Sequence, residues 1–188
     1  MIPIMHKLVR AIGCAPTAAS VVLALCGAIS CRADARAATS CLPTGDGYLR
    51  ARVAGAIDAD IDWPNSGTWC AGEPKTKPDG VRVSFRRTTG TRPRLLFIFG
   101  LTGVRAGRPL REGRANLTVI DETSGRVYGT LGDRRCTVDS LNQRRLAPHV
   151  YRVEAHGFCT QPARAVRGAG DILVSRFDFA GEVNYANP

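Results

Sequence analysis

Hydrophobic and polar residues alternate along most of the chain after residue 40, with the two-residue period of strands that are buried on one face. Short turns rich in glycine, proline and aspartate separate the alternating segments. Residues 121–125, for example, predict the turn of a β-hairpin. The pattern predicts seven strands, at residues 48–57, 81–86, 95–99, 117–119, 126–131, 150–158 and 172–179.

Two segments depart from simple alternation. Residues 95–99 are continuously apolar, which predicts a strand buried on both faces. Residues 139–147 predict the one short helix, with Asp139 as its N-cap and Pro148 as its stop. Strands do not alternate with long helices, so we expect an all-β fold, an antiparallel β-sandwich or barrel of about seven strands with one short helix.

The first part of the chain resembles a targeting sequence. Residues 1–37 have the three parts of a secretory signal peptide: a positive start at Lys7 and Arg10, an apolar middle and small residues before the cleavage site. We expect cleavage near Ala37, which leaves a single β-rich domain of residues 38–188. A retained membrane anchor is the alternative, and glycine and proline within the apolar stretch weaken it.

A second processing route involves Cys31. This cysteine follows Ala28-Ile29-Ser30, a degenerate form of a lipoprotein signal. Lipid attached to Cys31 would tether the domain to the outer membrane without changing its fold. Without lipid, the mature protein is expected to be periplasmic or secreted, and this anchor is the only membrane contact that the sequence predicts.

Composition and charge narrow the range of partners. The chain is 44% hydrophobic and 22% charged, which is typical of a globular protein, and its net charge is +10. Removal of residues 1–37 lowers the net charge to about +7, nearly all of it from arginine. An anionic glycan or another acidic envelope component fits this charge, although GC-rich codon usage explains the arginines equally well. Nucleic acid is disfavoured, because few aromatic residues are interleaved with the arginines.

Cysteine usage agrees with export. Three of the 7 cysteines lie in residues 1–37, which leaves Cys41, Cys70, Cys136 and Cys159. Four cysteines in an oxidising compartment predict two disulfides. We favour Cys41–Cys70 and Cys136–Cys159, because each pair is close in sequence and lies beside predicted strands. No Cys/His spacing typical of zinc is present.

Three aspartates, Asp58, Asp60 and Asp62, alternate along a short segment. An extended backbone places them on one side, and carboxylate oxygens are the ligands that calcium prefers. The EF-hand pattern fails, however, so a solvent-facing strand edge protected by charge is the alternative. Apart from this calcium hypothesis, the sequence predicts no cofactor.

Two further groups are candidate ligand-binding residues. Arg105, Arg108, Arg111 and Arg114 recur every third residue, and an extended loop would align them for phosphates or sulfates; a solvated loop is the alternative. Trp63 and Trp69 flank a turn. They are candidates for stacking on a sugar ring, and otherwise for capping the core of the β fold.

Signals for catalysis are sparse. The mature chain offers His149 and His156, no G-x-S-x-G motif and no phosphate-binding glycine loop. Asp133, Glu154 and Asp178 are possible paired carboxylates, as in a hydrolase. Ser175 has no identifiable base. An enzyme is therefore the least favoured class.

Several segments resemble a family of uncharacterised small exported proteobacterial proteins. The resemblance rests on YLRAR at residues 48–52, GAIDADIDW at 55–63, CTVD at 136–139, GFC at 157–159 and ILVSRFDF at 172–179. It implies a bacterial envelope location and a shared β domain, and it implies no activity. The expected function is therefore that of a non-catalytic binding or structural β module, with a calcium- or glycan-binding module as the alternative.

The intact mass of the protein recovered from its native envelope tests this processing. We expect a species that begins near Ala38 and takes up four alkyl groups only after reduction, because all four remaining cysteines would be paired. A mass that includes acyl chains at Cys31 would instead show a lipoprotein.

Overall fold

The computed structural model describes residues 39–76, 79–90, 93–132 and 134–186, so the expected signal peptide and Cys31 lie outside the described residues. Eleven strands and no helix occur in this part of the chain. It therefore offers no helix long and apolar enough to cross a membrane. The strands are β1 (Tyr48–Gly55), β2 (Ala59–Pro64), β3 (Thr68–Lys75), β4 (Gly80–Arg87), β5 (Leu95–Thr102), β6 (Leu110–Asp121), β7 (Arg126–Gly129), β8 (Cys136–Ala147), β9 (Val150–Cys159), β10 (Ala163–Ala165) and β11 (Asp171–Asn184).

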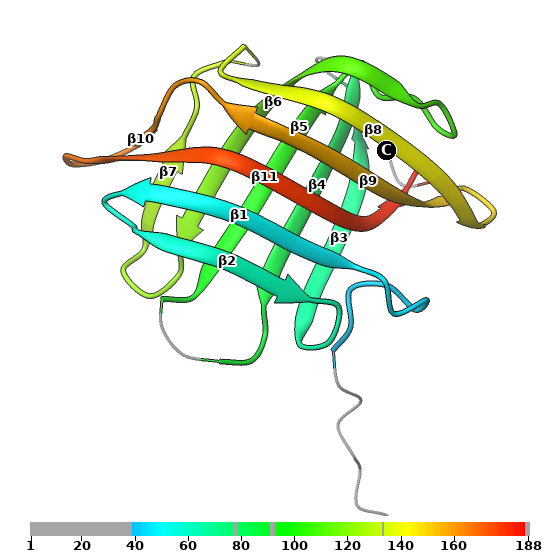
Figure 1. Cartoon of the computed structure of the whole chain (residues 1–188), viewed down its shortest axis with the longest axis horizontal. Helices are drawn as coiled ribbons and strands as arrows, with labels where there is room; N and C mark the ends of the chain where they lie inside the picture. The colour runs from blue at the N-terminus through cyan, green and yellow to red at the C-terminus, as the bar shows by residue number, and fades with distance from the viewer. Residues whose placement is uncertain (1–38, 77–78, 91–92, 133, 187–188) are drawn as a thin grey trace, which may run out of the picture. The chain divides into compact units, whose positions relative to one another are not determined.

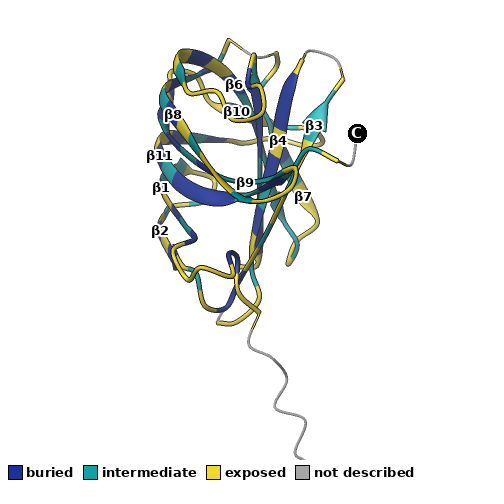
Figure 2. Ribbon diagram, turned by 90° about the vertical axis from the view of Figure 1, so that its right-hand side faces the viewer, coloured by how far each residue is buried: buried dark blue, intermediate teal, exposed yellow. Residues whose placement is uncertain are grey.

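All strand pairs are antiparallel, and together they form one continuous sheet. The main order is β2-β1-β11-β10-β7-β6-β5-β4-β3, while β8 joins β6 to β9 and β9 joins β8 to β11. The sheet folds into two layers (Figure 1): a front layer of β2, β1, β11, β9 and β8, and a back layer of β7, β6, β5, β4 and β3. In Figure 2 the layers are seen from the side, with buried residues between them, so the fold is all-β and sandwich-like.

Phenylalanines from both layers meet in the core. Phe85, Phe97 and Phe99 come from the back layer, and Phe177 and Phe179 come from β11 in the front layer. The ring of Phe99 lies 5.0 Å from that of Phe177 and 4.9 Å from that of Phe179, measured between centroids. Tilted aromatic pairs at such distances add stability beyond the burial of their apolar surface. The rings therefore join the two layers.

The seven predicted segments all overlap strands, but the predicted number of seven is too low. β2, β3, β8 and β10 are the four additional strands. β10 has only three residues, and β3 contains glycine and proline, which weaken a strand pattern in sequence. These four segments form strands because they make hydrogen bonds with neighbouring strands, and the local sequence pattern does not predict those hydrogen bonds.

The predicted helix is wrong, because residues 139–147 form most of β8. Val138 and Leu141 are both buried although they are three residues apart, which imitates the spacing of a helix face. A β-bulge between Val138 and Ser140 shifts the alternation by one residue and turns both side chains inward. Pro148 begins the turn to β9, in which His149 has a φ of 61°. Pro148 therefore ends a strand.

The expected burial of residues 95–99 on both faces is also wrong. Phe97 and Phe99 are fully buried, whereas Leu96 and Ile98 are only half-buried on the outer side of the back layer. No further layer of described residues covers that side, so it remains partly open to solvent.

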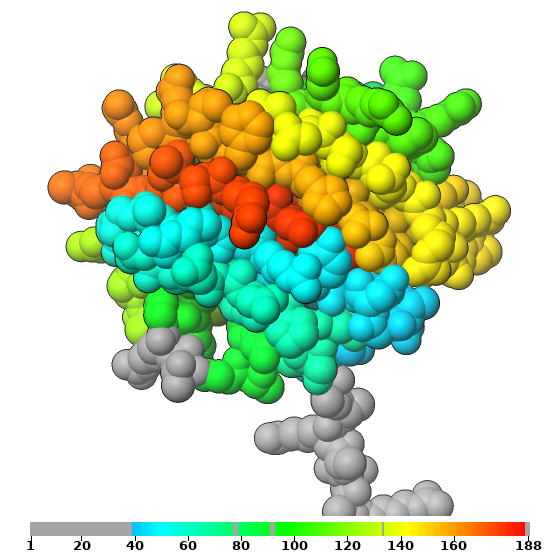
Figure 3. All heavy atoms as spheres, viewed as in Figure 1, coloured from blue at the N-terminus to red at the C-terminus, as the bar shows by residue number. Residues whose placement is uncertain are grey.

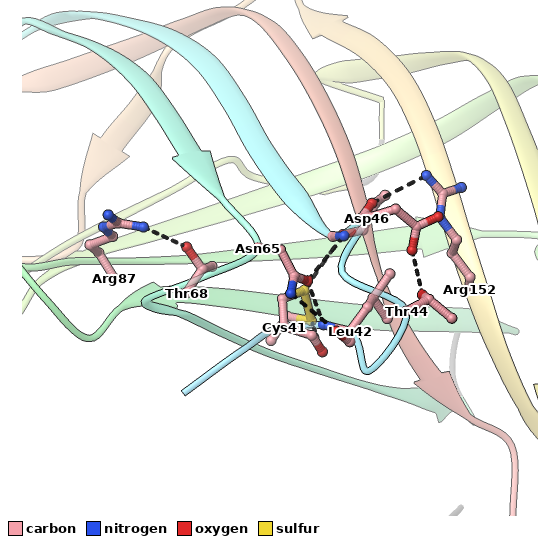
Figure 4. Close-up of a disulfide and its surroundings, with 11 residues drawn as sticks. Cys41, Leu42, Thr44, Asp46, Asn65, Thr68, Arg87 and Arg152 are labelled. Atoms are coloured by element: carbon pink, nitrogen blue, oxygen red, sulfur yellow. Dashed lines mark hydrogen bonds and ion pairs between the residues drawn. A yellow bond between two sulfur atoms is a disulfide. The ribbon is translucent and has the colours of Figure 1, made fainter. Parts of the chain in front are cut away.

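The structure contains both of the disulfides that the sequence predicts. Cys41–Cys70 joins the segment before β1 to β3, and Cys136–Cys159 joins β8 to β9. Beside the first disulfide, Asn65 Oδ1 accepts hydrogen bonds from the backbone N–H groups of Leu42 (2.7 Å) and Gly47 (3.0 Å) (Figure 4). Two structural disulfides indicate an oxidising, non-cytoplasmic location.

Replacement of a core phenylalanine tests the role of the ring cluster. Phe99→Ala should lower the free energy of unfolding by about 3–5 kcal/mol, because it leaves a cavity between the layers. Phe158→Ala is the matched control, since Phe158 is 37% exposed and should cost less than about 1 kcal/mol. Urea unfolding measures both, and equal losses would contradict this account.

Candidate functional site

A groove of about 460 Å³ lies on the outer side of the back layer, where β11 passes the edge of β3. The two strands approach closely, because a Cβ atom added to Gly72 would lie 2.4 Å from the carbonyl oxygen of Glu182. Only glycine permits this approach. The groove is lined by Trp69, Ala71, Gly72, Glu73, Arg82, Ser84, Glu182 and Asn184.

Trp69 is the aromatic wall of this groove. Alternation along β3 turns Trp69 outward, while its neighbour Cys70 packs against the core and is held by its disulfide. The indole is paired in register with Arg86, whose Cζ lies 5.4 Å from the ring centroid. This cation–π contact stabilises the position of the ring, and Trp69 remains 36% exposed.

The polar lining carries both signs of charge. Arg82 Nη1 lies 3.1 Å from Glu73 Oε1 across the β3–β4 pair. Glu182 and Asn184 reach the groove from the end of β11, and Ser84 adds a hydroxyl group. The lining therefore has two carboxylates and one guanidinium group, that of Arg82. Arg86, beside Trp69, lies 3.5 Å from Glu122 and does not line the groove.

Such a groove is suited to a ligand with both apolar and hydroxyl-rich faces. An exposed indole packs against apolar C–H surface, and carboxylate, amide and hydroxyl groups fix the orientation of a ligand by hydrogen bonds. Of these residues, the sequence analysis identified only Trp69. The alternation at residues 81–86 indicates that Arg82 and Ser84 face outward. Glu182 and Asn184 lie beside them only because β11 passes the edge of β3 in the folded protein.

Trp63 lies elsewhere. It is 9% exposed and packs edge-on against Phe97, with ring centroids 5.4 Å apart. Its edge closes one side of a smaller hollow of about 250 Å³ beside Arg87 and Arg94. Trp63 therefore caps the core, whereas Trp69 faces outward, and the two indoles do not form one platform.

Asp60 and Asp62 lie on β2 opposite Arg52 and Arg50 of β1, and Asp58 lies just before β2. Asp58 and Asp60 lie 2.7 Å and 3.7 Å from Arg52, and Asp62 lies 3.3 Å from Arg50. Calcium would have to displace these guanidinium groups. Within the described ranges, no group of three or more His, Cys, Asp or Glu side chains is arranged to hold a metal ion.

The four regularly spaced arginines do not lie on one extended loop. Arg105 and Arg108 belong to the β5–β6 loop, where both of their carbonyl groups accept hydrogen bonds from Gln143 Nε2 at 2.7 Å. Arg111 and Arg114 lie on β6 and are both exposed, because Glu112, with a φ of 56°, interrupts the alternation between them. The structure thus divides the series between a loop and a strand.

A network of charged side chains covers the outer side of the front layer, which faces the viewer in Figure 3. Tyr48 Oη donates to Asp178 (2.7 Å) and lies 3.0 Å from Glu154. Arg152 lies 2.8 Å from Glu154 and 2.8 Å from Asp46, and Asp46 also accepts from Thr44 (Figure 4).

These contacts shift the pKa values of the groups involved. The hydrogen bond from Arg152 holds the pKa of Glu154 below its ordinary value of 4.5. The hydrogen bond from Thr44, together with the charges of Arg152 and Arg144, lowers the pKa of Asp46. Burial and the two neighbouring carboxylates raise the pKa of the Tyr48 hydroxyl, so it stays protonated at neutral pH.

Three of the catalytic candidates, Glu154, His156 and Asp178, meet in this network. His156 Nδ1 lies 3.0 Å from Asp178 Oδ1, and Ser140 lies opposite His156 in the register of the next strand. A Ser-His-Asp mechanism needs a hydrogen bond from the hydroxyl to the imidazole. Among the described residues no such bond joins Ser140 to His156, whose side chain is 44% exposed. Asp133 lies outside the described residues, and neither His149 nor Ser175 joins this network.

No protein-family model, curated protein or solved structure shows a significant match to this chain. Its function is therefore inferred from the chemistry of its own residues.

Substitution of Arg152 tests the charged network. Arg152→Gln should lower the free energy of unfolding at pH 7 by about 1–3 kcal/mol, because two carboxylates lose a charged partner. A carboxyl group whose pKa is lowered by folding stabilises the protein above its ordinary pKa, and this contribution disappears as the pH falls through the lowered value. The difference between the two proteins should therefore shrink from pH 5 to pH 2.

Urea unfolding at several pH values measures this effect. Arg145→Gln, at an exposed position on β8, is the control and should change stability by less than about 0.5 kcal/mol. A difference between wild type and Arg152→Gln that is constant with pH would contradict the assignment to these ion pairs.

Proposed function

We propose that this chain is an exported module of the bacterial envelope that binds a neutral saccharide in the groove beside Trp69. The observation that carries the proposal is a half-exposed indole, fixed by Arg86, in a groove whose other walls are polar. Sugar rings have an apolar face that packs on an indole and hydroxyl groups that bond to carboxylates, amides and guanidinium groups. The groove offers each of these.

Its size and charge indicate the class of ligand. About 460 Å³ lies within the usual range of roughly 300–1,000 Å³ for small-molecule sites. Because two carboxylates and only one guanidinium group line it, the groove has no excess positive charge to attract an acidic polymer. This local balance favours a neutral saccharide over the anionic glycan suggested by the overall charge of the chain.

Binding is favoured over catalysis for a structural reason. The groove contains Glu73 and Glu182, but Glu73 is held by Arg82 at 3.1 Å and is half exposed. An exposed carboxylate that is paired with a guanidinium group serves as a hydrogen-bond acceptor, so we assign the groove to recognition.

The predicted leader in residues 1–37 and the two disulfides support a location in the periplasm or outside the cell. Saccharides of the cell envelope are abundant in both places. A groove that offers an exposed indole and polar side chains fits attachment to such material.

Tryptophan fluorescence provides a direct test, because the chain has only 2 tryptophans. Trp63→Phe leaves Trp69 as the only indole. Neutral oligosaccharides of glucose, galactose and N-acetylglucosamine should then protect Trp69 from quenching by acrylamide. Trp69→Ala should reduce the affinity for the same oligosaccharide at least about tenfold, because the stacking surface is lost.

Phe158→Ala is the matched control, since Phe158 is a similarly exposed aromatic residue on the other layer. It should bind saccharide as wild type does. Thermal unfolding checks that Trp69→Ala remains folded. Absence of binding to every oligosaccharide, or equal binding by wild type and Trp69→Ala, would overturn the proposal.

A further inference from the structure

Two loops at one end of the domain expose apolar side chains next to arginines. The first connects β7 to β8, and the second runs from the end of β9 through β10 to β11. Leu131 is 73% exposed and Val166 is 66% exposed, whereas Trp69 and Phe158 are only 36% and 37% exposed. We define the basic end by these two residues and four neighbouring arginines: Leu131, Arg134, Arg135, Arg164, Val166 and Arg167.

The two loops surround a shared depression. Two adjoining hollows, of about 130 Å³ and 350 Å³, share Leu131, Arg135 and Gln161 in their linings. Arg164 lines the first hollow and Arg134 the second. In Figure 3 the orange and yellow-green side chains of these loops project from the upper left part of the molecule. Three guanidinium groups therefore border one depression.

These arginines differ in their partners from three arginines of the front layer. Arg50, Arg52 and Arg152 each form an ion pair with a carboxylate. No described ion pair involves an arginine of the basic end. Asp171 lies opposite Arg164 in the register but forms no ion pair with it. The positive charge here is thus largely uncompensated among the described residues.

Described residues of both loops are bonded to the strands beside them. The Cys136–Cys159 disulfide joins the strand that follows the first loop to the strand that precedes the second. Next to it, the Thr160 N–H donates to the carbonyl of Arg135 at 2.9 Å, and Arg135 Nε donates to the carbonyl of Leu131 at 3.3 Å. Val166 N–H donates to the carbonyl of Val127 at 2.8 Å.

We propose that the basic end docks on the surface of an anionic lipid bilayer. The arginines contact lipid phosphates, and Leu131 and Val166 enter the boundary between headgroups and acyl chains. A soluble polyanion would neutralise the same arginines but would leave both apolar side chains in water. The pairing of exposed apolar tips with unpaired guanidinium groups therefore fits a lipid surface better than a polysaccharide or a nucleic acid. The interaction requires no acyl chain on the protein and is independent of the saccharide groove.

Co-sedimentation with vesicles tests this docking. The oxidised mature protein should bind vesicles of phosphatidylcholine with 30% phosphatidylglycerol and should not bind phosphatidylcholine alone. Arg134→Gln/Arg164→Gln should weaken binding roughly twenty- to thirtyfold, because each basic residue near such a surface contributes about fivefold. Leu131→Ser/Val166→Ser should weaken binding about tenfold while keeping every charge.

Arg94→Gln/Arg145→Gln removes the same charge from exposed positions outside the basic end and is the matched control. It should bind vesicles within about twofold of wild type, and thermal unfolding confirms that all variants are folded.

Three results would overturn the proposal: no binding to anionic vesicles, equal losses in the control and the basic-end arginine variants, or wild-type binding by Leu131→Ser/Val166→Ser. The last result would indicate a polyanion site. Because the vesicles contain no saccharide, the outcome is separate from that of the Trp69 groove.

Discussion

The packing of phenylalanine rings between the two layers is the interaction on which the rest of this structure depends. Phe177 and Phe179 lie on β11, which pairs with β1, β9 and β10 and also passes the edge of β3. Their contacts with Phe85 and Phe99 set the position of β11 over the back layer. That position also places the Trp69 groove, because β11 belongs to the front layer and its end reaches β3 of the back layer.

The outer surfaces then divide by charge. The front layer carries paired charges, in which arginines of β1 and β9 are held by carboxylates of neighbouring segments. The groove on the back layer is lined by two carboxylates and one guanidinium group and contains the exposed indole of Trp69. The basic end has unpaired arginines and exposed apolar tips. Arginines in this protein therefore occur in three settings: in ion pairs of the front layer, beside the Trp69 groove and at the basic end. The neighbours of each side chain distinguish these settings.

The two disulfides lie beside different surfaces for which we propose a function. Cys41–Cys70 anchors β3 directly beside Trp69, while Cys136–Cys159 joins the two strands from which the loops of the basic end extend. Each crosslink lowers the entropy of the unfolded chain, and each also limits movement of the adjacent surface. A saccharide groove on one layer and a lipid-facing end would together hold the domain between a membrane and envelope polymer.

The sequence by itself determined the all-β class, the position of seven strand segments and both cysteine pairings, because two-residue alternation and cysteine spacing are local properties. Alternation at residues 81–86 placed Arg82 and Arg86 on one face, but the sequence left open whether Trp69 caps the core or faces outward. It also gave no sign that Glu182 and Asn184 lie beside Trp69. The bulge at Asp139 imitated a helix, since it moved Val138 and Leu141 onto one face of a strand. Only the tertiary structure decided such features, because contacts between strands far apart in sequence leave no periodic signal along the chain.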